Sequence, residues 1–466
     1  MKGSRTDTAS AILLMIAAIP SLHATLFKGG GMPLIAGPAL ALYILLQWRR
    51  QPASVRILIA ITAAVSAVAL VIARHPGQLF LAAVGKACFF AAFFSAIGLL
   101  RAASDTSTMV RRCGALLLGQ PPARRYIILS IGAHIFGLIL NVGALTLLGA
   151  MIRRSNTLEA ASGSEPIRQA RERRMCMALM RGFATTSISS PLGTAMAVIV
   201  SCMPGLTWLA VAPYCLTTSA GLIAIGWLDD HLRRPRNLPR LAGRQSGEWT
   251  PLVQFVGLVV FVTLLSLAVA EWAGSSISGG VMAAAVIVGC GWIAWQHRER
   301  GPANALRATG RRLVEQAVPT FTGLRAEIGM LSSAGLLGSL APAFVAPGTV
   351  EGLLAYTGLH GAGVAIALSW LMIVCAQVGI NPILAATVIA TTVTQPEAFG
   401  LSRTMLATTL FSTWGVATMS SPVSATVTVL HSIMKVPPAR IAYRWNGPYA
   451  LAAMAALDLW IWLLAR

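Results

Sequence analysis

The residues best placed to do chemistry in this sequence belong to a short hydroxyl-rich motif that occurs twice. Residues 189–198 read SSPLGTAMAV, and residues 420–429 read SSPVSATVTV. Each copy interrupts an apolar stretch that is long enough to cross a membrane. A proline inside such a span frees backbone carbonyls on the preceding turn, and the half-helix that follows presents unpaired N–H groups with a partial positive charge. The motif can therefore offer carbonyls to a cation, N–H groups to an anion and hydroxyls to either.

We take the polar and small residues of the two interruptions as the main candidates for binding a substrate or an ion. Two broken helices in corresponding places of two half-chains are typical of transporter binding sites. The alternative is that the hydroxyls only satisfy backbone groups around a proline kink, but the duplication favours binding. The candidates are Ser187, Ser189, Ser190, Gly193 and Thr194 in the first copy and Thr418, Ser420, Ser421, Ser424 and Thr426 in the second.

Side-chain amides and neighbouring glycines form a second group of candidates. They interrupt two further apolar stretches, 126–151 and 361–393. An amide at membrane depth needs partners, and it can both donate and accept hydrogen bonds. These residues either bind a ligand or cap the helices on each side of a turn, and the sequence leaves both readings open. They are Asn141 and Gly143 in the first stretch and Gln377, Gly379 and Asn381 in the second.

Charged residues inside apolar spans form a third, smaller group. A charge at the centre of a membrane helix costs about 2.5–3.5 kcal/mol on insertion scales, so each one is a candidate for function. Lys86, Arg181 and Arg325 lie near predicted span ends, where long side chains can reach the interface. Glu327 is the one carboxylate well inside a predicted span of the repeated core. It is our candidate for proton coupling, with a salt bridge to another helix as the alternative.

Membrane helices must hold these residues, because the composition excludes an ordinary soluble protein. Hydrophobic residues make up 56% of the chain, charged residues make up 11%, and the mean hydropathy is +0.71. We therefore predict an all-α polytopic membrane protein. About eleven stretches approach the ~20 apolar residues that cross a bilayer, namely 9–27, 33–47, 56–73, 79–100, 175–203, 206–228, 251–270, 277–295, 319–344, 404–431 and 445–464.

The formal net charge of +21 reports orientation in the membrane. With the N-terminus in the cytoplasm, most Lys and Arg residues fall in cytoplasmic loops, as the positive-inside tendency of membrane proteins requires. The loops 271–276 and 345–360, which then face outward, contain no Lys or Arg. We expect a multi-pass protein of the inner (plasma) membrane with its C-terminus outside. The charge then gives no reason to expect nucleic acid as a partner.

The same orientation places both ends of 126–151 in the cytoplasm and both ends of 361–393 outside. Each stretch is therefore predicted to be a re-entrant hairpin. Irregular backbone at membrane depth is tolerated only where protein or a wet cavity surrounds it. Two hairpins thus imply a central site.

The chain also carries the marks of a duplicated unit. Residues 141–143 (NVG) match 377–379 (QVG), and 95–100 resemble 333–338, with nearly constant spacing to the repeated motif. The predicted crossings carry the two broken helices in opposite directions, so the repeats are inverted. We expect scaffold segments at 1–125 and 229–345, and transport segments at 126–228 and 346–466.

A family resemblance rests on the basic residues, the turn at 141–143 and the segment RGFATTSISSPLGT at 181–194. In this order they resemble the ion transporter superfamily. The nearest layout is that of the divalent anion/sodium symporters, with arsenite-permease-type relatives. The resemblance implies eleven spans, two hairpins, a scaffold part that forms a homodimer and a transport part that moves as an elevator.

These features together predict a secondary active transporter for a small anion, a carboxylate or an inorganic anion, driven by Na⁺ or H⁺. A membrane-embedded enzyme is an alternative, although such enzymes usually gather acids, histidines or metal ligands at one face and this chain has 15 Asp and Glu residues. An anion channel is another. The seven cysteines show no paired spacing, so we expect no metal, no disulfide and no cofactor, apart from Na⁺ as a possible coupling ion. The expected partners are the anion, the lipid bilayer and a second copy of the chain.

Overall fold

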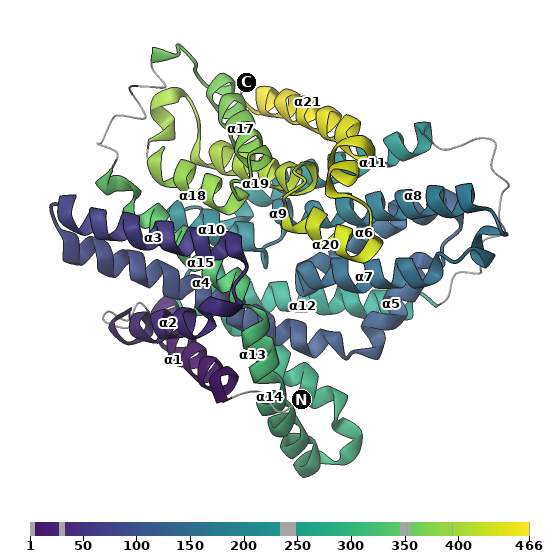
Figure 1. The fold of residues 1–466 in the computed structure, drawn as a ribbon, viewed down its shortest axis with the longest axis horizontal. Coiled ribbons are helices and arrows are strands. Elements are labelled where there is room, and N and C mark those ends of the chain that lie inside the picture. Colours follow the sequence, from purple (N-terminus) through teal and green to yellow (C-terminus); the bar gives the residue numbers. More distant parts are fainter. Residues whose placement is uncertain are drawn as a thin grey trace.

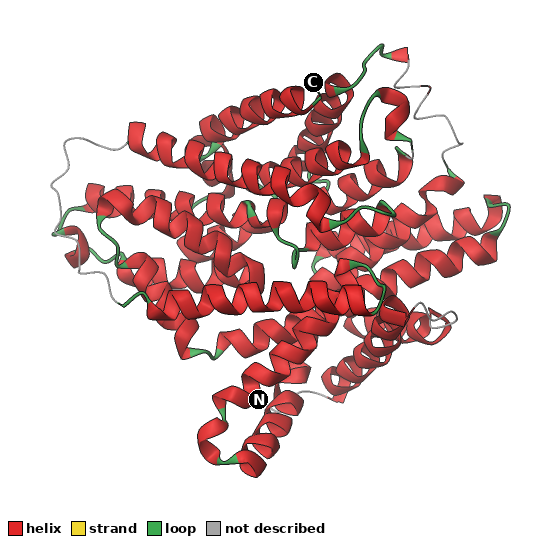
Figure 2. Cartoon of the chain, turned by 180° about the vertical axis from the view of Figure 1, so that it is seen from behind, coloured by secondary structure: helices red, strands yellow, loops and turns green. Residues whose placement is uncertain are grey.

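A computed structural model describes residues 5–27, 33–233, 248–344, 352, 356–393 and 395–465. Within these ranges every regular element is helical (Figure 2), as predicted for an all-α polytopic membrane protein. Nine of the described helices are long and apolar enough to cross a membrane. They are α1 (Arg5–Phe27), α3 (Ala53–Ile72), α4 (Pro76–Asp105), α6 (Pro122–Leu140), the run α8 to α10 (Glu165–Cys202), α11 (Trp208–Leu232), α12 (Thr250–Trp272), α13 (Ile277–Gln296) and α21 (Gly447–Leu464).

Eight of the predicted spans are among these nine helices. Of the other three, one forms a shorter helix and two are each divided between two helices. The stretch 33–47 forms α2 (Pro33–Gln47), which has 15 residues. The stretch 319–344 is divided, because α14 (Pro302–Gly323) ends just before α15 (Arg325–Leu340) begins. The stretch 404–431 is interrupted between α19 (Arg403–Ser420) and α20 (Ala425–Met434).

Small residues allow the helices around α4 to pack closely. A Cβ built on Gly98 of α4 would lie 2.5 Å from a methyl of Leu324, and one built on Gly289 of α13 would lie 3.3 Å from the backbone of α4. Small residues at helix interfaces let backbones approach and strengthen packing where lipid supplies no hydrophobic drive. The helices α1, α3, α13 and α15 all pack against α4. All five lie in the segments predicted as scaffold.

The stretch 126–151 folds back on itself as predicted for a hairpin. Helix α6 is followed by α7 (Val142–Ser155), and Asn141 alone joins them with a φ of +49°. Both arms pack against α5 (Thr108–Leu118). Gly132 of α6 contacts Leu117 of α5, and a Cβ built on Gly114 of α5 would lie 2.7 Å from the sulfur of Met151 in α7. In Figure 1, α6, α7 and α8 lie side by side. This hairpin thus packs directly on the first broken helix.

The second predicted hairpin consists of α17 (Ala362–Gln377) and α18 (Pro382–Thr392). Its turn needs Gly379, whose φ is +93°. The Asn381 side chain accepts a hydrogen bond from the Ile383 N–H at 2.9 Å and so caps α18. Helix α19 runs through the centre of the fold (Figure 1) and contacts both arms of this hairpin as well as α9, α10, α11 and α21.

Candidate binding site at the broken helices

The first broken helix opens at the first copy of the motif. Helix α8 (Glu165–Ala184) and the short α9 (Thr186–Ser189) precede the gap, and α10 (Thr194–Cys202) follows it. Pro191 lacks an N–H and cannot continue the ladder of backbone hydrogen bonds. The last N–H of the first part, that of Ser190, still reaches the Thr186 carbonyl at 3.0 Å. The backbone therefore opens between Ser190 and Gly193.

This gap leaves hydrogen-bonding groups without partners. The Ser190 hydroxyl is buried, with the residue 2% exposed, and has no hydrogen-bond partner. A Cβ built on Gly193 would lie 3.4 Å from it, so the hydroxyl sits against the first residue before α10. Gly193 has no side chain with which to cap the first N–H groups of α10. A buried hydroxyl without a partner thus lies beside the N-terminus of α10, and a helix N-terminus favours negative charge.

The other candidates of the first copy have different surroundings. Ser189 Oγ donates to the Thr185 carbonyl at 3.5 Å, and the Ser189 carbonyl accepts from Trp208 Nε1 at 3.3 Å. Ser187 and Thr194 are half-buried. Ser190 thus differs from these residues in being buried while its hydroxyl has no partner.

At the second break, most of the polar groups have hydrogen-bond partners in the second hairpin or in α20. Ser421 Oγ donates to the Ala376 carbonyl at 2.7 Å, and Gln377 Nε2 donates to Ser420 Oγ at 3.4 Å. Ser424 Oγ accepts from the Val427 N–H at 3.2 Å and caps α20. The structure thus brings the tip of the second hairpin to the second break. These hydroxyls mend the backbone, as the structural alternative expected.

The remaining candidates near this break, Thr418, Thr426 and Gln377, are bonded or buried. Thr418 Oγ1 donates to the Gly415 carbonyl at 2.8 Å. Thr426, in the first turn of α20, is buried with 3% of its surface exposed. Gln377 is itself held by Tyr443, whose hydroxyl donates to Gln377 Oε1 at 3.1 Å. The sequence reasoning missed Tyr443, and a tyrosine in the segment before the last span offered no specific signal.

The two hairpin tips each touch a helix of the predicted scaffold. A Cβ built on Gly143 would lie 2.9 Å from Arg101 Nε of α4. Asn381 Nδ2 donates to the Met330 sulfur of α15 at 2.9 Å. Gly143 therefore lies against Arg101, whereas Thr185 and Thr186 of the first broken helix contact His134, which lies two turns earlier in α6 than Asn141.

The two broken helices cross close to both gaps. A Cβ built on Gly415 of α19 would lie 2.5 Å from Ile188 Cγ1 and 3.1 Å from the Ala184 carbonyl. At about 1.5 Å of rise per residue, Gly415 lies about 9 Å before Ser421, and Ile188 lies about 3 Å before Ser190. Gly415 therefore permits a close crossing of the two broken helices, which brings the two copies of the motif near each other.

The position of Arg181 corrects a prediction. It was expected to extend to the interface, but it is buried, with 2% of its surface exposed. Arg181 Nη2 pairs with Asp229 Oδ2 at 2.9 Å, Nη1 bonds the Tyr126 hydroxyl at 3.1 Å, and the guanidinium carbon lies 4.0 Å above the Tyr449 ring. A buried charge persists when it is paired and fully bonded. The ammonium of Lys86 donates to the Ser201 carbonyl in the last turn of α10.

Arg181 also connects the two broken helices. Its Nε donates to Asn446 Oδ1 at 2.9 Å, and Asn446 Nδ2 donates to the Met419 carbonyl at 2.9 Å. The Met419 carbonyl lies in the last turn of α19, where the break at Pro422 removes the usual helical donor. Arg181 on α8 thus supports, through Asn446, an open carbonyl end of α19. Sequence reasoning missed Asn446.

A further feature that the sequence analysis missed is a set of hydroxyls along α19. Thr409, Ser412 and Thr413 are each at most 1% exposed, and their oxygens have no hydrogen-bond partner. Their spacing of three and four residues puts them on one side of the helix. That spacing was visible in the sequence and could have identified them.

Glu327 occupies the first turn of α15 and is half-buried, where an acid is favoured by the helix dipole. The one-residue break between α14 and α15, at Leu324, places this helix start next to Glu327. Met330, the contact of Asn381, lies one turn further along the same helix.

Comparison with solved structures shows that this fold resembles those of two membrane transporters. The YdaH transporter of Alcanivorax borkumensis is 13% identical, with a TM-score of 0.53 over 87% of this chain and 95% of that one. MtrF of Neisseria gonorrhoeae, from a class of antimetabolite efflux pumps, is 13% identical with a TM-score of 0.50 over 88% and 94%. No protein-family model and no curated protein matches the sequence. The chain therefore has the fold of these membrane transporters, and that likeness identifies its architecture.

Proposed function

We propose that the protein is a secondary active transporter that moves a small anion, a carboxylate or an inorganic anion, across the inner membrane. The observation that carries the proposal is the open first break, where the unpartnered Ser190 hydroxyl lies beside the uncapped N-terminus of α10. A helix N-terminus favours negative charge. The transporter fold of the solved neighbours supports transport over enzymatic activity.

The coupling ion in this proposal is Na⁺ or H⁺. The α19 hydroxyls Thr409, Ser412 and Thr413 need partners that the protein does not give them, and oxygen atoms are the ligands that hard cations prefer. Glu327 stays our candidate for proton coupling, because it lies one turn from the Met330 contact of the second hairpin. No Asp, Glu, His or Cys cluster able to hold a metal occurs in the described part of the chain.

The mechanism we propose is an elevator-type movement of the transport segments 126–228 and 346–466 against the scaffold segments 1–125 and 229–345. Each hairpin tip contacts its scaffold helix through a flexible side chain, Arg101 or Met330. Such contacts can be exchanged at low cost. The cytoplasmic N-terminus, the outer C-terminus, the homodimer and the kinship with divalent anion/sodium symporters belong to this proposal.

The test is anion uptake by the purified protein in proteoliposomes. We expect uphill uptake of at least one carboxylate or inorganic anion that collapses when the Na⁺ and H⁺ gradients are removed. Uptake that proceeds equally without either gradient indicates the anion channel instead. Failure of every anion in the panel, with the protein folded, contradicts the proposal.

The Ser190 site is tested separately with Ser190→Ala. Loss of one charge-assisted hydrogen bond is worth about 1.5–3 kcal/mol, so we expect the concentration for half-maximal uptake to rise by about tenfold or more. Ser66→Ala is the matched control, because Ser66 is a buried serine of α3 whose hydroxyl bonds its own helix at 2.7 Å. Equal half-maximal concentrations in both variants remove Ser190 from the site.

A further inference from the structure

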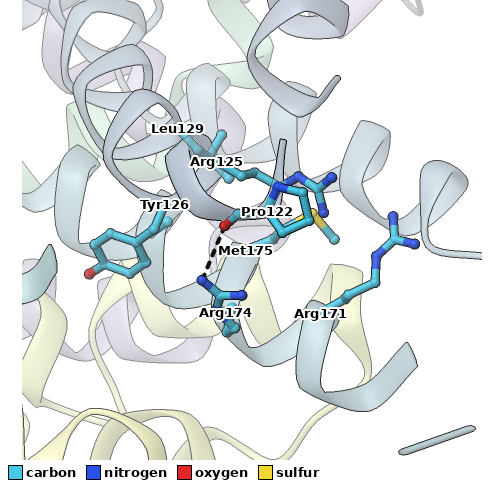
Figure 3. Close-up of a pocket in the computed structure, with 8 residues that line it drawn as sticks. Pro122, Arg125, Tyr126, Leu129, Arg171, Arg174 and Met175 are labelled. Carbon is cyan, nitrogen blue, oxygen red and sulfur yellow. Dashed lines mark hydrogen bonds between the residues drawn. The ribbon is translucent and has the colours of Figure 1, made fainter. Parts of the chain in front are cut away.

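A small cavity lies at the cytoplasmic ends predicted for α6 and α8 (Figure 3). Its volume is about 20 Å³, which is room for one water-sized group. It can therefore receive a single oxygen of a larger ligand that sits at its mouth. The residues around it are Pro122, Arg125, Tyr126, Leu129, Arg171, Arg174, Met175 and Ala178.

Two of the three arginines at this cavity lack a negative partner. Arg174 is compensated, because it makes a bidentate pair with Asp230 at 2.6 and 2.7 Å. Arg125 Nε donates to the neutral Gln120 carbonyl at 2.9 Å, and Arg171 donates to the neutral Ala160 carbonyl. Within the described residues neither Arg125 nor Arg171 has an ion pair with a carboxylate.

The unsatisfied donors of these arginines are partly withdrawn from water. The Nε of Arg171 is buried and has no hydrogen-bond partner. Arg125 belongs to the first turn of α6, where the Pro121 carbonyl already accepts hydrogen bonds from the Arg124 and Arg125 N–H groups. The guanidinium groups are therefore the donors that remain for a ligand, and guanidinium groups are typical ligands of phosphate oxygens. Two arginines at one cavity, without a carboxylate partner among the described residues, therefore make an anion site.

Apolar side chains continue the cavity toward the membrane interior. Leu129, Met175 and Ala178 lie one turn or more further along α6 and α8 and are buried. A cationic rim with an apolar floor between helices, on the cytoplasmic side, is the arrangement that binds the headgroups of anionic lipids.

We propose that Arg125 and Arg171 together bind a phosphate group at the cytoplasmic membrane surface, supplied by an anionic phospholipid or by inorganic phosphate. The ligand joins α6, an arm of the first hairpin, to α8, the first half of a broken helix. Its occupancy stabilises that pairing. The site lies at the α6 and α8 ends and does not depend on the transport proposal.

Native mass spectrometry of the full-length protein in detergent, with added phosphatidylglycerol or phosphatidylcholine, tests the site. We expect the wild type to retain phosphatidylglycerol in preference to phosphatidylcholine. The double variant Arg125→Gln, Arg171→Gln should bind phosphatidylglycerol about tenfold or more weakly, because charge-assisted hydrogen bonds are lost. The matched control is Arg111→Gln, Arg112→Gln, which removes the same charge from exposed positions on α5 and should bind as the wild type does.

A parallel thermal-shift series with inorganic phosphate distinguishes the two sources. Stabilisation by phosphate that the double variant loses, without retained phosphatidylglycerol, identifies free phosphate as the ligand. The single variant Arg171→Gln replaces the double variant if the latter fails to fold, and the same loss is expected. Equal binding of both ligands by wild type, double variant and control overturns the proposal, as does binding of neither by the wild type.

Discussion

Ser190 and Ser421 occupy the same position in the two copies of the motif, yet their hydroxyls have different environments. Ser421 bonds a carbonyl of the second hairpin, whereas Ser190 has no partner. Removing a satisfied hydroxyl leaves one acceptor unpaired, while removing Ser190 takes away a group that is free to bind a ligand. The two serines therefore share a position in the repeat but differ in hydrogen bonding.

The ion pair of Arg181 leads to a prediction about stability. Breaking a buried pair costs about 3–5 kcal/mol, because a charge is left uncompensated. Asp229 also pairs with Arg233 at 2.6 Å, so it keeps a partner when Arg181 is lost. Arg181, however, has no other carboxylate within ion-pair distance among the described residues. We therefore expect Asp229→Asn to lower the melting temperature more than Arg181→Gln does.

Thermal unfolding in detergent measures this order, with Arg111→Gln at an exposed position of α5 as the control that should change little. A melting temperature of Asp229→Asn equal to that of the wild type contradicts the assignment of Arg181 as a buried ion.

At the scale of elements, the packing of α19 on α9 decides how the two breaks meet. Helix α19 carries Gly415 where Ile188 and the Ala184 carbonyl approach it. Farther along, Asn446 holds the open Met419 carbonyl while Arg181 holds Asn446. The two broken helices are thus held together by the close contact at Gly415 and by the hydrogen bonds that run from Arg181 through Asn446 to Met419.

Gly415→Ala tests this crossing. The added methyl would lie 2.5 Å from Ile188 Cγ1, and such overpacking costs about 1–3 kcal/mol. We expect slower uptake and a lower melting temperature, with partial recovery when Ile188→Ala is added. Gly221→Ala on α11, where a Cβ meets nothing within 4 Å, should behave as the wild type. Normal uptake and stability in Gly415→Ala would show that the crossing tolerates separation.

At the scale of the whole molecule, the hairpin tips form the contacts that the proposed movement must change. Gly143 lies against Arg101, and Asn381 lies against Met330. The helices that carry Arg101 and Met330, α4 and α15, pack on each other. Both tips therefore contact one packed pair of helices, α4 and α15.

Cross-linking tests the movement. With the native cysteines replaced, we expect a short thiol-cleavable linker between Arg101→Cys and Gly143→Cys to reduce uptake to about a tenth or less, with recovery after cleavage. A link between Gly98→Cys and Leu324→Cys, which lie together inside the proposed scaffold, should leave uptake unchanged. Full uptake with the first pair linked rules out movement of this hairpin tip away from α4.

The sequence by itself determined the helical membrane class, the two breaks and the two hairpins. These features depend on local properties, namely runs of apolar residues, prolines without an N–H and the spacing of turns. The contact between Gln377 and Ser420 at the second break, by contrast, came from the structure. It misjudged 319–344, because an apolar run does not reveal that Gly323 ends one helix and Arg325 begins another.

Only the tertiary structure decided which polar groups have partners. Arg181 and Asn446 are 265 residues apart in the sequence. No local pattern reveals that these two side chains will form a buried hydrogen bond with each other. The same holds for Ser190. Its hydroxyl is unpartnered because none of the described segments around it places a hydrogen-bonding group within reach of it. Burial and hydrogen bonding at these sites depend on contacts between distant segments, whereas helix formation and helix breaking depend on neighbours in the chain.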